Sequence, residues 1–341
     1  PSTGTFTTTG ANFYFMNPNG LIFKEGAQIN VNGSFFATTS NSISLGTDGV
    51  FFADLGSASV LTSSPPAAFG FLNSNPGKIA LEGTQLVTGL SRTRPSGASI
   101  SLIGGNITLD QAAPGATTQL SPFIPNSTGS LIQPTGNRFD IGSVASAGNV
   151  VPGGAGYDLS SFDTLGEVTI TGGTILDTTE VYIRGGNVVI DNALIAPGYL
   201  FLAGLTGPPG GGTIDIGATQ QISITGTEPI QTFGAPFIPL PDKSGMPFVT
   251  GITTFGGTPV PTPSPTASNI NINGGDVSVS AVAAIISERL GPSTAADINI
   301  SGNTVEVRNG AFIANINTYT GAGGNITVDA EQIILDGEGN T

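Results

Sequence analysis

The sequence predicts an all-β protein: a right-handed single-stranded parallel β-helix (a solenoid) with loops or hairpins that leave the coil. Three observations support this prediction. Charged residues make up only 9% of the 341 residues, whereas a soluble globular domain contains roughly 25%. The 51 Gly and 24 Pro residues separate short apolar bursts, which is typical of many short strands and tight turns. A short block of Gly-Gly followed by alternating polar and apolar residues also recurs along the chain.

The recurring block is Gly-Gly-Asn followed by apolar, polar, apolar and polar residues. Its closest copies begin at Gly104-Gly105-Asn106, Gly185-Gly186-Asn187 and Gly323-Gly324-Asn325, with looser copies at Gly211 and Gly274. Each block predicts a strand with one apolar, β-branched face that it cannot bury alone. Stacking the copies in register, about 4.8 Å apart, would bury the inward Ile, Val and Leu residues together. We expect the Gly-Gly pairs to allow a positive φ, and the Asn side chains to hydrogen-bond their own backbone or to stack as ladders.

Other folds fit this pattern less well. A β-propeller needs four strands per blade and a period of about 40–50 residues, whereas Asp297 and Asn325, which occupy equivalent places in the pattern, are 28 residues apart. A β-sandwich would not explain the repeated Gly-Gly-Asn. One segment, residues 281–290 (AVAAIISERL), has a helical alternative, but we expect it to continue the strands.

Three segments break the pattern and are expected to leave the coil as loops: residues 57–76, 111–137 and 227–268. The last is the longest and the richest in proline. Because proline cannot donate to a strand ladder, we expect an extended, outward loop there. Long excursions on a rigid solenoid are where binding variation is usually placed, although a merely protective or disordered insertion fits equally well.

The composition argues against several classes of function. The net charge is −14, and the nine Lys and Arg residues form no cluster that could neutralise the phosphates of a nucleic acid. The chain contains no His, no Cys and no adjacent acidic pair. Asp110, Asp191 and Asp329 could stack within the roughly 5–10 Å that acid–base catalysis needs, but each ends a repeated strand and needs no catalytic explanation. We therefore expect no enzyme, no metal site and no cofactor.

The most specific motif lies near the start of the chain. An apolar strand, Phe13–Met16, leads into Asn17-Pro18-Asn19-Gly20, and a second apolar strand follows. The tetrapeptide predicts a β-turn by itself. Pro18 presets φ, Asn19 tolerates a positive φ, and Asn17 can close the turn with its side chain. Gly20 then releases the chain into the next strand.

This passage resembles the haemagglutination-activity, or two-partner secretion, domain of filamentous haemagglutinin-like exoproteins of Gram-negative bacteria. Segments at 77–81, 102–106 and 138–144 also match that family, so the resemblance covers most of residues 11–145 and, as generic repeats, 166–341. It implies that the turn at Asn17, Pro18, Asn19 and Gly20 nucleates the coil and is recognised by a partner outer-membrane transporter.

The resemblance also predicts a domain organisation. Residues 1–150 would form a two-partner-secretion-like β-helix domain, N-terminally incomplete because only about ten residues precede the motif. Residues 151–341 would continue the β-helix repeats, with the Pro-rich loop at 227–268.

The function implied is that of a secreted protein, extracellular or on the cell surface of a Gram-negative bacterium, that acts in adhesion or surface coating. Besides the transporter, its partners would be a host, matrix or polysaccharide ligand, and no nucleic acid. One alternative is a subunit of an extracellular filament, because uncapped coils expose strand edges that can pair end to end. A less supported alternative is a polysaccharide-active β-helix enzyme.

Overall fold

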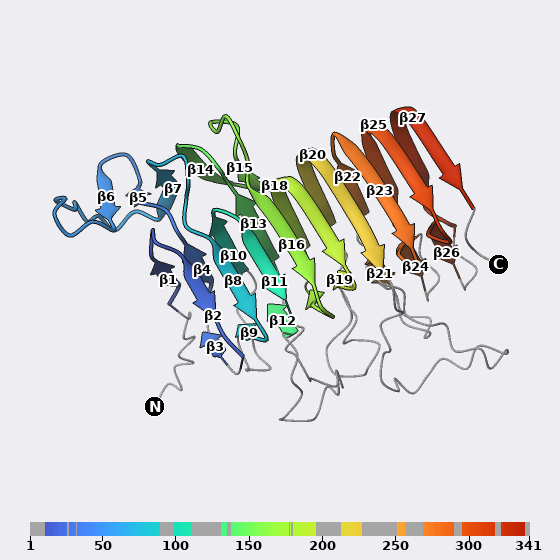
Figure 1. Ribbon diagram of the computed structural model, residues 1–341. Coiled ribbons are helices and arrows are strands. Elements are labelled where there is room, and N and C mark those ends of the chain that lie inside the picture. Colours follow the sequence, from blue (N-terminus) through green and yellow to red (C-terminus); the bar gives the residue numbers. More distant parts are fainter. Residues whose placement is uncertain are drawn as a thin grey trace, which may run out of the picture.

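The computed structural model describes residues 11–25, 27–31, 33–88, 99–110, 131–134, 138–176, 178, 180–195, 213–226, 251–256, 269–289, 295–317 and 322–337. Across these ranges the regular structure is strand and turn, with no helix. Most strands lie side by side in a long row that runs from the N-terminal to the C-terminal end (Figure 1). The prediction of an all-β protein with parallel sheets is confirmed.

The chain passes over the same three faces repeatedly in the same order, and we call each full pass over the three faces a rung. The largest sheet has 14 strands, and most rungs cross it twice in succession, over a first face and then a second face. The first face contains β1 (Phe13–Met16), β4 (Phe35–Thr38), β10 (Ser99–Gly104), β13 (Arg138–Ser143) and β22 (Asn269–Asn273). The second face contains β2 (Leu21–Phe23), β8 (Ile79–Glu82), β11 (Ile107–Asp110), β16 (Glu167–Thr171) and β23 (Asp276–Ala281). Four long strands cross both faces: β18 (Glu180–Asp191), β20 (Thr213–Gly226), β25 (Ile298–Arg308) and β27 (Ile326–Asp336).

An eight-stranded parallel sheet forms the third face. Its strands are β3 (Gln28–Val31), β9 (Gln85–Thr88), β12 (Leu131–Pro134), β17 (Ile175–Leu176), β19 (Leu194–Ile195), β21 (Gly251–Gly256), β24 (Ala284–Arg289) and β26 (Phe312–Asn317). Each of these strands pairs with the third-face strand of the neighbouring rung.

Alternate residues of the strands point inward and form one apolar interior. On the first face Ile100 pairs with Phe35 on one side and Phe139 on the other, and all three side chains are fully buried. On the second face Ile107 and Val168 pair in the same way and are also fully buried. Burying one such side chain stabilises a fold by about 1.5–3 kcal/mol. The continuous aliphatic interior expected from the period-two pattern is thus present.

Polar side chains link neighbouring rungs where the strands begin. The Asn106 Oδ1 accepts a hydrogen bond from the Glu167 backbone N–H at 3.1 Å. The Asp297 Oδ1 accepts one from the Asn325 backbone N–H at 2.7 Å, across 28 residues of sequence. These side chains thus satisfy backbone donors of the neighbouring rung that strand pairing leaves free.

The corner between the first and second faces, which we call the first corner, requires glycine because neighbouring rungs approach closely there. A Cβ on Gly105 would lie 2.3 Å from the Pro76 carbonyl oxygen, and one on Gly186 would lie 2.5 Å from that of Leu165. The predicted reason for these glycines, a positive φ, is wrong. None of the six glycines in the three Gly-Gly-Asn blocks has one. The close approach of two rungs selects glycine here, a role distinct from its freedom to adopt positive φ.

The third block lies at a different corner from the first two. The first two blocks precede strands of the second face, whereas Gly323-Gly324-Asn325 precedes Ile326, which pairs with Ile298 on the first face. The prediction that all three blocks stack on one another is therefore wrong for the third. The two corners impose the same steric requirement. A Cβ on Gly324 would lie 2.2 Å from the Ala296 carbonyl oxygen, so glycine is required at both corners.

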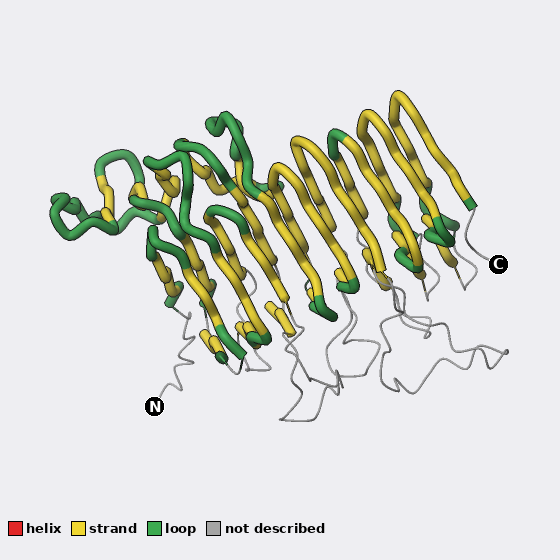
Figure 2. Tube along the Cα trace, viewed as in Figure 1, coloured by secondary structure: helices red, strands yellow, loops and turns green. Residues whose placement is uncertain are grey.

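Two excursions leave the rungs at the first corner, at residues 39–78 after β4 and residues 144–166 after β13. They meet in a five-stranded antiparallel sheet with the order β15-β14-β7-β5-β6. Its strands are β5 (Ser42–Leu45), β6 (Gly49–Phe52), β7 (Pro66–Phe71), β14 (Gly148–Gly153) and β15 (Gly156–Asp158). A second apolar cluster, which includes Phe69, Val150 and the Tyr14 and Phe36 side chains of the first face, holds this sheet against the rungs. Figure 2 shows the excursions as the looped region at the N-terminal end.

The predicted loops need correction. Residues 57–76 do leave the rungs, but they contain β7, and the excursion at 144–166 has no counterpart among the predictions. Residues 111–137 and 227–268 contain β12 and β21, which lie on the third face; the rest of both segments lies outside the described residues. A strand of one rung needs only a few residues that alternate between inward and outward side chains, so short strands are difficult to recognise within polar, proline-rich sequence. Residues 281–290 contain β24 in place of the alternative helix.

Gly105→Ala tests the close approach at the first corner. Because the added Cβ meets a backbone carbonyl 2.3 Å away, we expect the free energy of unfolding to fall by about 1–3 kcal/mol, the usual cost of overpacking. Gly323→Ala is the matched control, since nothing lies within 4 Å of its added Cβ. Urea unfolding followed by circular dichroism measures both. Equal effects of the two substitutions would contradict the explanation.

Candidate functional site

The turn at Asn17, Pro18, Asn19 and Gly20 forms the first corner of the first rung, between β1 and β2. The Asn17 backbone carbonyl accepts a hydrogen bond from the Gly20 N–H, and its Oδ1 accepts one from the Asn19 N–H, both at 3.1 Å. The prediction that Asn17 closes the turn is confirmed. The residue with positive φ (116°) is Gly20, so the conformation predicted for Asn19 is wrong. A Cβ on Gly20 would also lie 3.0 Å from the Lys78 carbonyl oxygen.

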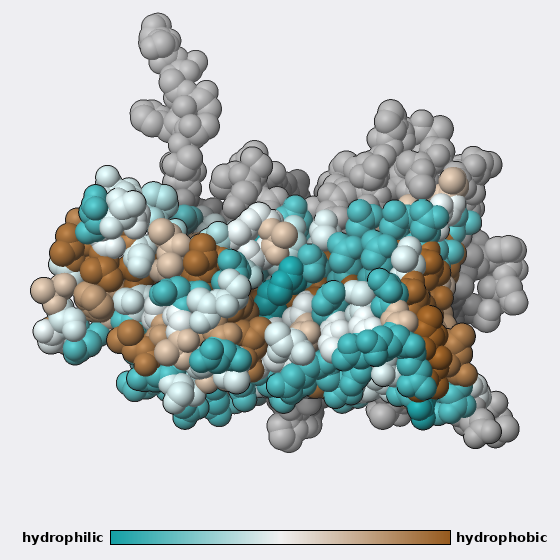
Figure 3. Space-filling model, turned by 90° about the horizontal axis from the view of Figure 1, so that it is seen from above, coloured by the Kyte–Doolittle hydropathy of each residue, from teal (hydrophilic) through white to brown (hydrophobic). Residues whose placement is uncertain are grey.

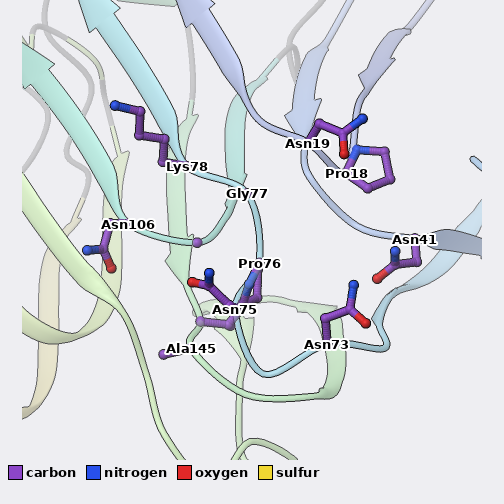
Figure 4. Close-up of a pocket in the computed structure, with 12 residues that line it drawn as sticks. Pro18, Asn19, Asn41, Asn73, Asn75, Pro76, Gly77, Lys78, Asn106 and Ala145 are labelled. Carbon is purple, nitrogen blue, oxygen red and sulfur yellow. The ribbon is translucent and has the colours of Figure 1, made fainter.

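A groove of about 670 Å³ opens beside this turn (Figure 4). Four successive rungs contribute their first corners to it, and the first excursion adds three asparagines. The lining residues are Pro18, Asn19, Asn41, Asn73, Asn75, Pro76, Gly77, Lys78, Gly105, Asn106, Val144 and Ala145. The groove therefore contains residues from well-separated parts of the sequence that only rung stacking brings together.

Backbone hydrogen bonds hold the floor of the groove. The Gly77 carbonyl accepts hydrogen bonds from the Gly105 N–H at 2.9 Å and from the Thr39 hydroxyl at 2.7 Å. A Cβ on Gly77 would lie 2.4 Å from the Pro18 carbonyl oxygen. The corner glycines thus let adjacent rungs close up, and the resulting floor is fixed by main-chain geometry.

The walls of the groove present carboxamides and one ammonium group, and no carboxylate is among the described residues that line it. Within the described part of the chain, the side chains of Asn19, Asn73 and Asn75 make no hydrogen bond. Figure 4 shows Asn41 and Asn73 on one side of the groove and Asn106 on the other, with Lys78 at the rim and its ammonium extended outward. Such a surface offers both donors and acceptors together with one positive charge.

Lys78 differs from the other cations whose side chains the structure describes. Lys24 pairs with Glu82, Arg138 with Asp140, Arg184 with Asp215, and Arg308 with Glu306. Lys78 makes no ion pair with any described residue. In a chain with a net charge of −14, this leaves one positive group free at the edge of the groove.

Two arginines fix the second excursion, which supplies Val144 and Ala145 to the groove. The Arg138 guanidinium donates to both Asp140 carboxylate oxygens at 2.8 and 2.9 Å and to the Gly153 and Gly154 carbonyls at 2.8 and 2.9 Å. Arg184 donates to the neighbouring Ala155 carbonyl at 3.0 Å. Burial raises the pKa of Asp140, and its ion pair with Arg138 opposes that rise. The tip of this excursion is therefore bound to strands of the first face.

Comparison with known proteins identifies this end of the chain. Residues 3–151 match the family model of the TPS secretion domain. This part of the chain is therefore similar to TPS secretion domains. It includes the Asn17 turn, the first excursion and every residue that lines the groove. No curated protein and no solved structure matches the chain significantly.

The TPS domain marks exoproteins that Gram-negative bacteria secrete by the two-partner pathway, so the resemblance inferred from the residues is confirmed. The match covers less than half of the 341 residues. Whether residues 1–150 and 151–341 are separate domains stays a prediction. The strands themselves continue across residue 150, since β18 pairs with β13, β16 and β20.

The three carboxylates considered as catalytic candidates do not come together. Asp110 pairs with Thr171 and Asp191 with Thr225 on the second face, whereas Asp329 lies on the first face. Among the described residues no cluster of acidic, His or Cys side chains could hold a metal ion. A helix of the length and hydropathy needed to cross a membrane is likewise missing from those residues.

The sequence indicated part of this site. It placed a functional turn at Asn17–Gly20 and a structural role at Gly105 and Asn106, and the structure brings these together in one groove. It did not single out the asparagines at 73 and 75, whose only signal was an Asn-Ser-Asn-Pro run in a segment expected to be a loop. Lys78 was noted only as part of the family-like segment 77–81, without a role of its own.

Asn17→Ala tests the closure of the turn. Because the Asn19 N–H loses its acceptor, we expect the free energy of unfolding to fall by about 1 kcal/mol. The adjacent control Asn19→Ala removes a side chain without a hydrogen bond and should leave stability within about 0.5 kcal/mol of the parent. Urea midpoints measure both. Stability unchanged in Asn17→Ala would show that the turn closes without its side chain.

Arg138→Met tests the attachment of the second excursion. The substitution leaves the Asp140 carboxylate buried without its partner, and we expect a loss of about 2–3 kcal/mol at neutral pH, reduced from the cost of a fully buried pair because Arg138 is partly exposed. A raised pKa means that the folded state holds the Asp140 proton more tightly, so the variant should lose stability as pH rises above about 4.

Two controls accompany Arg138→Met. Arg138→Met combined with Asp140→Asn removes the buried charge and should regain part of the loss. Lys24→Met breaks an exposed ion pair and should change stability by less than about 1 kcal/mol. Thermal unfolding from pH 4 to 8 compares the variants, and a pH-independent loss in Arg138→Met would contradict the role of the buried carboxylate.

Proposed function

We propose that this chain is a cell-surface exoprotein of the filamentous haemagglutinin type, exported by a partner outer-membrane transporter and acting outside the cell in adhesion or surface coating. The observation that supports this most directly is the TPS domain over residues 3–151, which contains the groove at the first corner. In this proposal the transporter recognises that region, including the turn at Asn17–Gly20.

The rungs are proposed to form a right-handed parallel β-helix. Parallel pairing on all three faces supports this, because each strand returns beside its equivalent in the preceding rung. Connections between parallel strands of one sheet are right-handed in roughly 98% of cases. Each rung contacts mainly its neighbours, so such a coil can fold progressively from one end as the chain emerges from a transporter.

The proposed role in adhesion rests on the stiffness and surface of this coil. Low charge and outward polar side chains give a rod with many neutral hydrogen-bonding groups, and Figure 3 shows stretches of hydrophilic residues over the C-terminal half of one face. A host, matrix or polysaccharide ligand would suit such a surface. Among the residues that the structure describes, no carboxylate that could act as a general acid lines the groove, so a polysaccharide-active enzyme is the least supported alternative.

A filament subunit is a second candidate, favoured by the exposed apolar residues of the outermost rungs. On β27 the side chains of Ile333 and Leu335 are 52% and 77% exposed, and Phe13 on β1 is 49% exposed. The apolar band at the C-terminal end is visible in Figure 3. Further rungs of a longer chain would cover the β27 edge equally well. Electron microscopy distinguishes the candidates, because short uniform rods would reject end-to-end assembly.

Export is tested by expressing the chain behind a signal sequence, with and without a two-partner-secretion outer-membrane transporter from the same genome. We expect the chain to reach the medium or the cell surface only when the transporter is present. Residues 152–341 behind the same signal sequence should stay in the periplasm, because they lack the TPS domain. Equal export of the two forms, or export without the transporter, would overturn the proposed route. Cells that display the chain should then bind matrix- or polysaccharide-coated surfaces better than cells without it.

A further inference from the structure

We propose that the groove at the first corner binds a neutral, linear oligosaccharide outside the cell, and that its asparagine carboxamides recognise the sugar hydroxyls. This inference rests on the proposed role in adhesion and names the ligand class of one site on the coil. Three features of the groove support it: asparagine side chains from separate rungs, amide donors without partners among the described residues, and no described carboxylate in the lining.

Two of the asparagines are held so that their NH₂ groups remain available. The Asn41 Oδ1 accepts a hydrogen bond from the Leu72 N–H at 2.9 Å, and the Asn106 Oδ1 accepts one from the Glu167 N–H at 3.1 Å. Because a backbone N–H can only donate, it fixes the carboxamide oxygen toward itself and leaves the NH₂ group free for a ligand. Neither NH₂ group has a hydrogen-bond partner among the described residues. Both amides are therefore oriented before a ligand arrives.

Three further asparagines, Asn19, Asn73 and Asn75, line the same groove, and their side chains make no hydrogen bond within the described part of the chain. Each carboxamide offers an acceptor and two donors. A sugar hydroxyl both donates and accepts, so two neighbouring hydroxyls of one ring can pair with the two ends of one carboxamide. The rings of Pro18 and Pro76 add apolar surface among these amides, which suits the C–H face of a pyranose ring.

The charge around the groove favours a neutral ligand. Figure 4 shows the Lys78 side chain extending away from the asparagines, so its ammonium group does not point into the groove. The chain as a whole has a net charge of −14 and repels polyanions at long range. Hydrogen bonding to uncharged hydroxyls is therefore the interaction that this lining supports.

The groove exists only in the folded coil and therefore acts where the folded chain acts, outside the cell. Its floor is fixed by the Gly105 to Gly77 hydrogen bond at 2.9 Å. A site held by main-chain contacts loses little conformational entropy on binding. Many copies of the chain on one cell would engage a polysaccharide surface together, so that weak binding at each groove adds up to firm attachment.

The test uses the full folded chain and three probes, cellohexaose, maltohexaose and mannohexaose, with affinity measured by calorimetry. We expect at least one of them to bind at millimolar concentrations or below. Asn106→Asp keeps an oxygen that accepts from the Glu167 N–H and removes the NH₂ donor, so it should weaken binding about tenfold, the upper range for one hydrogen bond lost. Asn73→Ala combined with Asn75→Ala should weaken it by a similar factor.

Two controls accompany these substitutions. Asn149→Asp makes the same charge change as Asn106→Asp at an exposed asparagine outside the groove lining, and it should bind as the parent does. Lys78→Gln should also retain the affinity, because the ammonium group points away from the groove. Urea midpoints check the folding of every variant. The Asn73 and Asn75 side chains make no hydrogen bond to the described residues, so the double variant decides the question if Asn106→Asp unfolds.

The outcomes separate this inference from the proposed function. The inference is overturned if none of the three oligosaccharides binds the parent chain, if the folded groove variants bind as tightly as the parent, or if Asn149→Asp loses as much affinity as Asn106→Asp. Polygalacturonate that binds more tightly than the neutral probes, and loses its binding in Lys78→Gln, would reassign the groove to an acidic polysaccharide. Failed export, or displaying cells that do not adhere, counts against the proposed function, whereas oligosaccharide binding by the purified chain is measured independently.

Discussion

The spacing between adjacent rungs at the first corner is the constraint on which the rest of the structure depends. Parallel strands lie about 4.8 Å apart, and at this corner the backbone of one rung rests directly on the carbonyl groups of the next. A Cβ at Gly77, Gly105 or Gly186 would lie 2.3–2.5 Å from such an oxygen. Glycine therefore lets the aliphatic interior of each face remain in register across the corner. The same close approach creates the floor of the groove, so the fold and the candidate site share one physical cause.

The first corner is also where the chain can be interrupted without damage to the core. Both excursions leave and return at this place, so the strands of the first and second faces keep their pairing on either side of them. The polar contacts that hold the second excursion include a buried ion pair between Arg138 and Asp140. Such pairs contribute little net stability compared with apolar packing, but breaking one is costly. The ion pair thus fixes the position of the tip of the second excursion, and the second apolar cluster provides most of the energy that holds the excursion against the rungs.

The sequence predicted the fold well because two simple periodicities are visible in it: alternation along each strand and recurrence of Gly-Gly-Asn between rungs. The same pattern could not say which corner a block occupies, since Gly105 and Gly324 meet identical steric demands. Nor could it reveal β21, whose six residues lie in a proline-rich segment and are recognisable only through pairing with β19 and β24. The turn at Asn17 was predictable because it is local. The groove was not, because Asn19, Asn73 and Asn106 become neighbours only after several rungs have stacked.

The groove forms only when several rungs have stacked. The residues of the groove span positions 18–145 and come from four successive rungs and the first excursion. A linear Asn-Pro-Asn-Gly segment exists in any conformation of the chain, whereas the groove exists only once the fourth rung has been added. The groove is therefore present in the folded rungs and absent from an unfolded chain that contains the same motif. The corner contacts between successive rungs thus determine both the pairing of the strands and the shape of the groove.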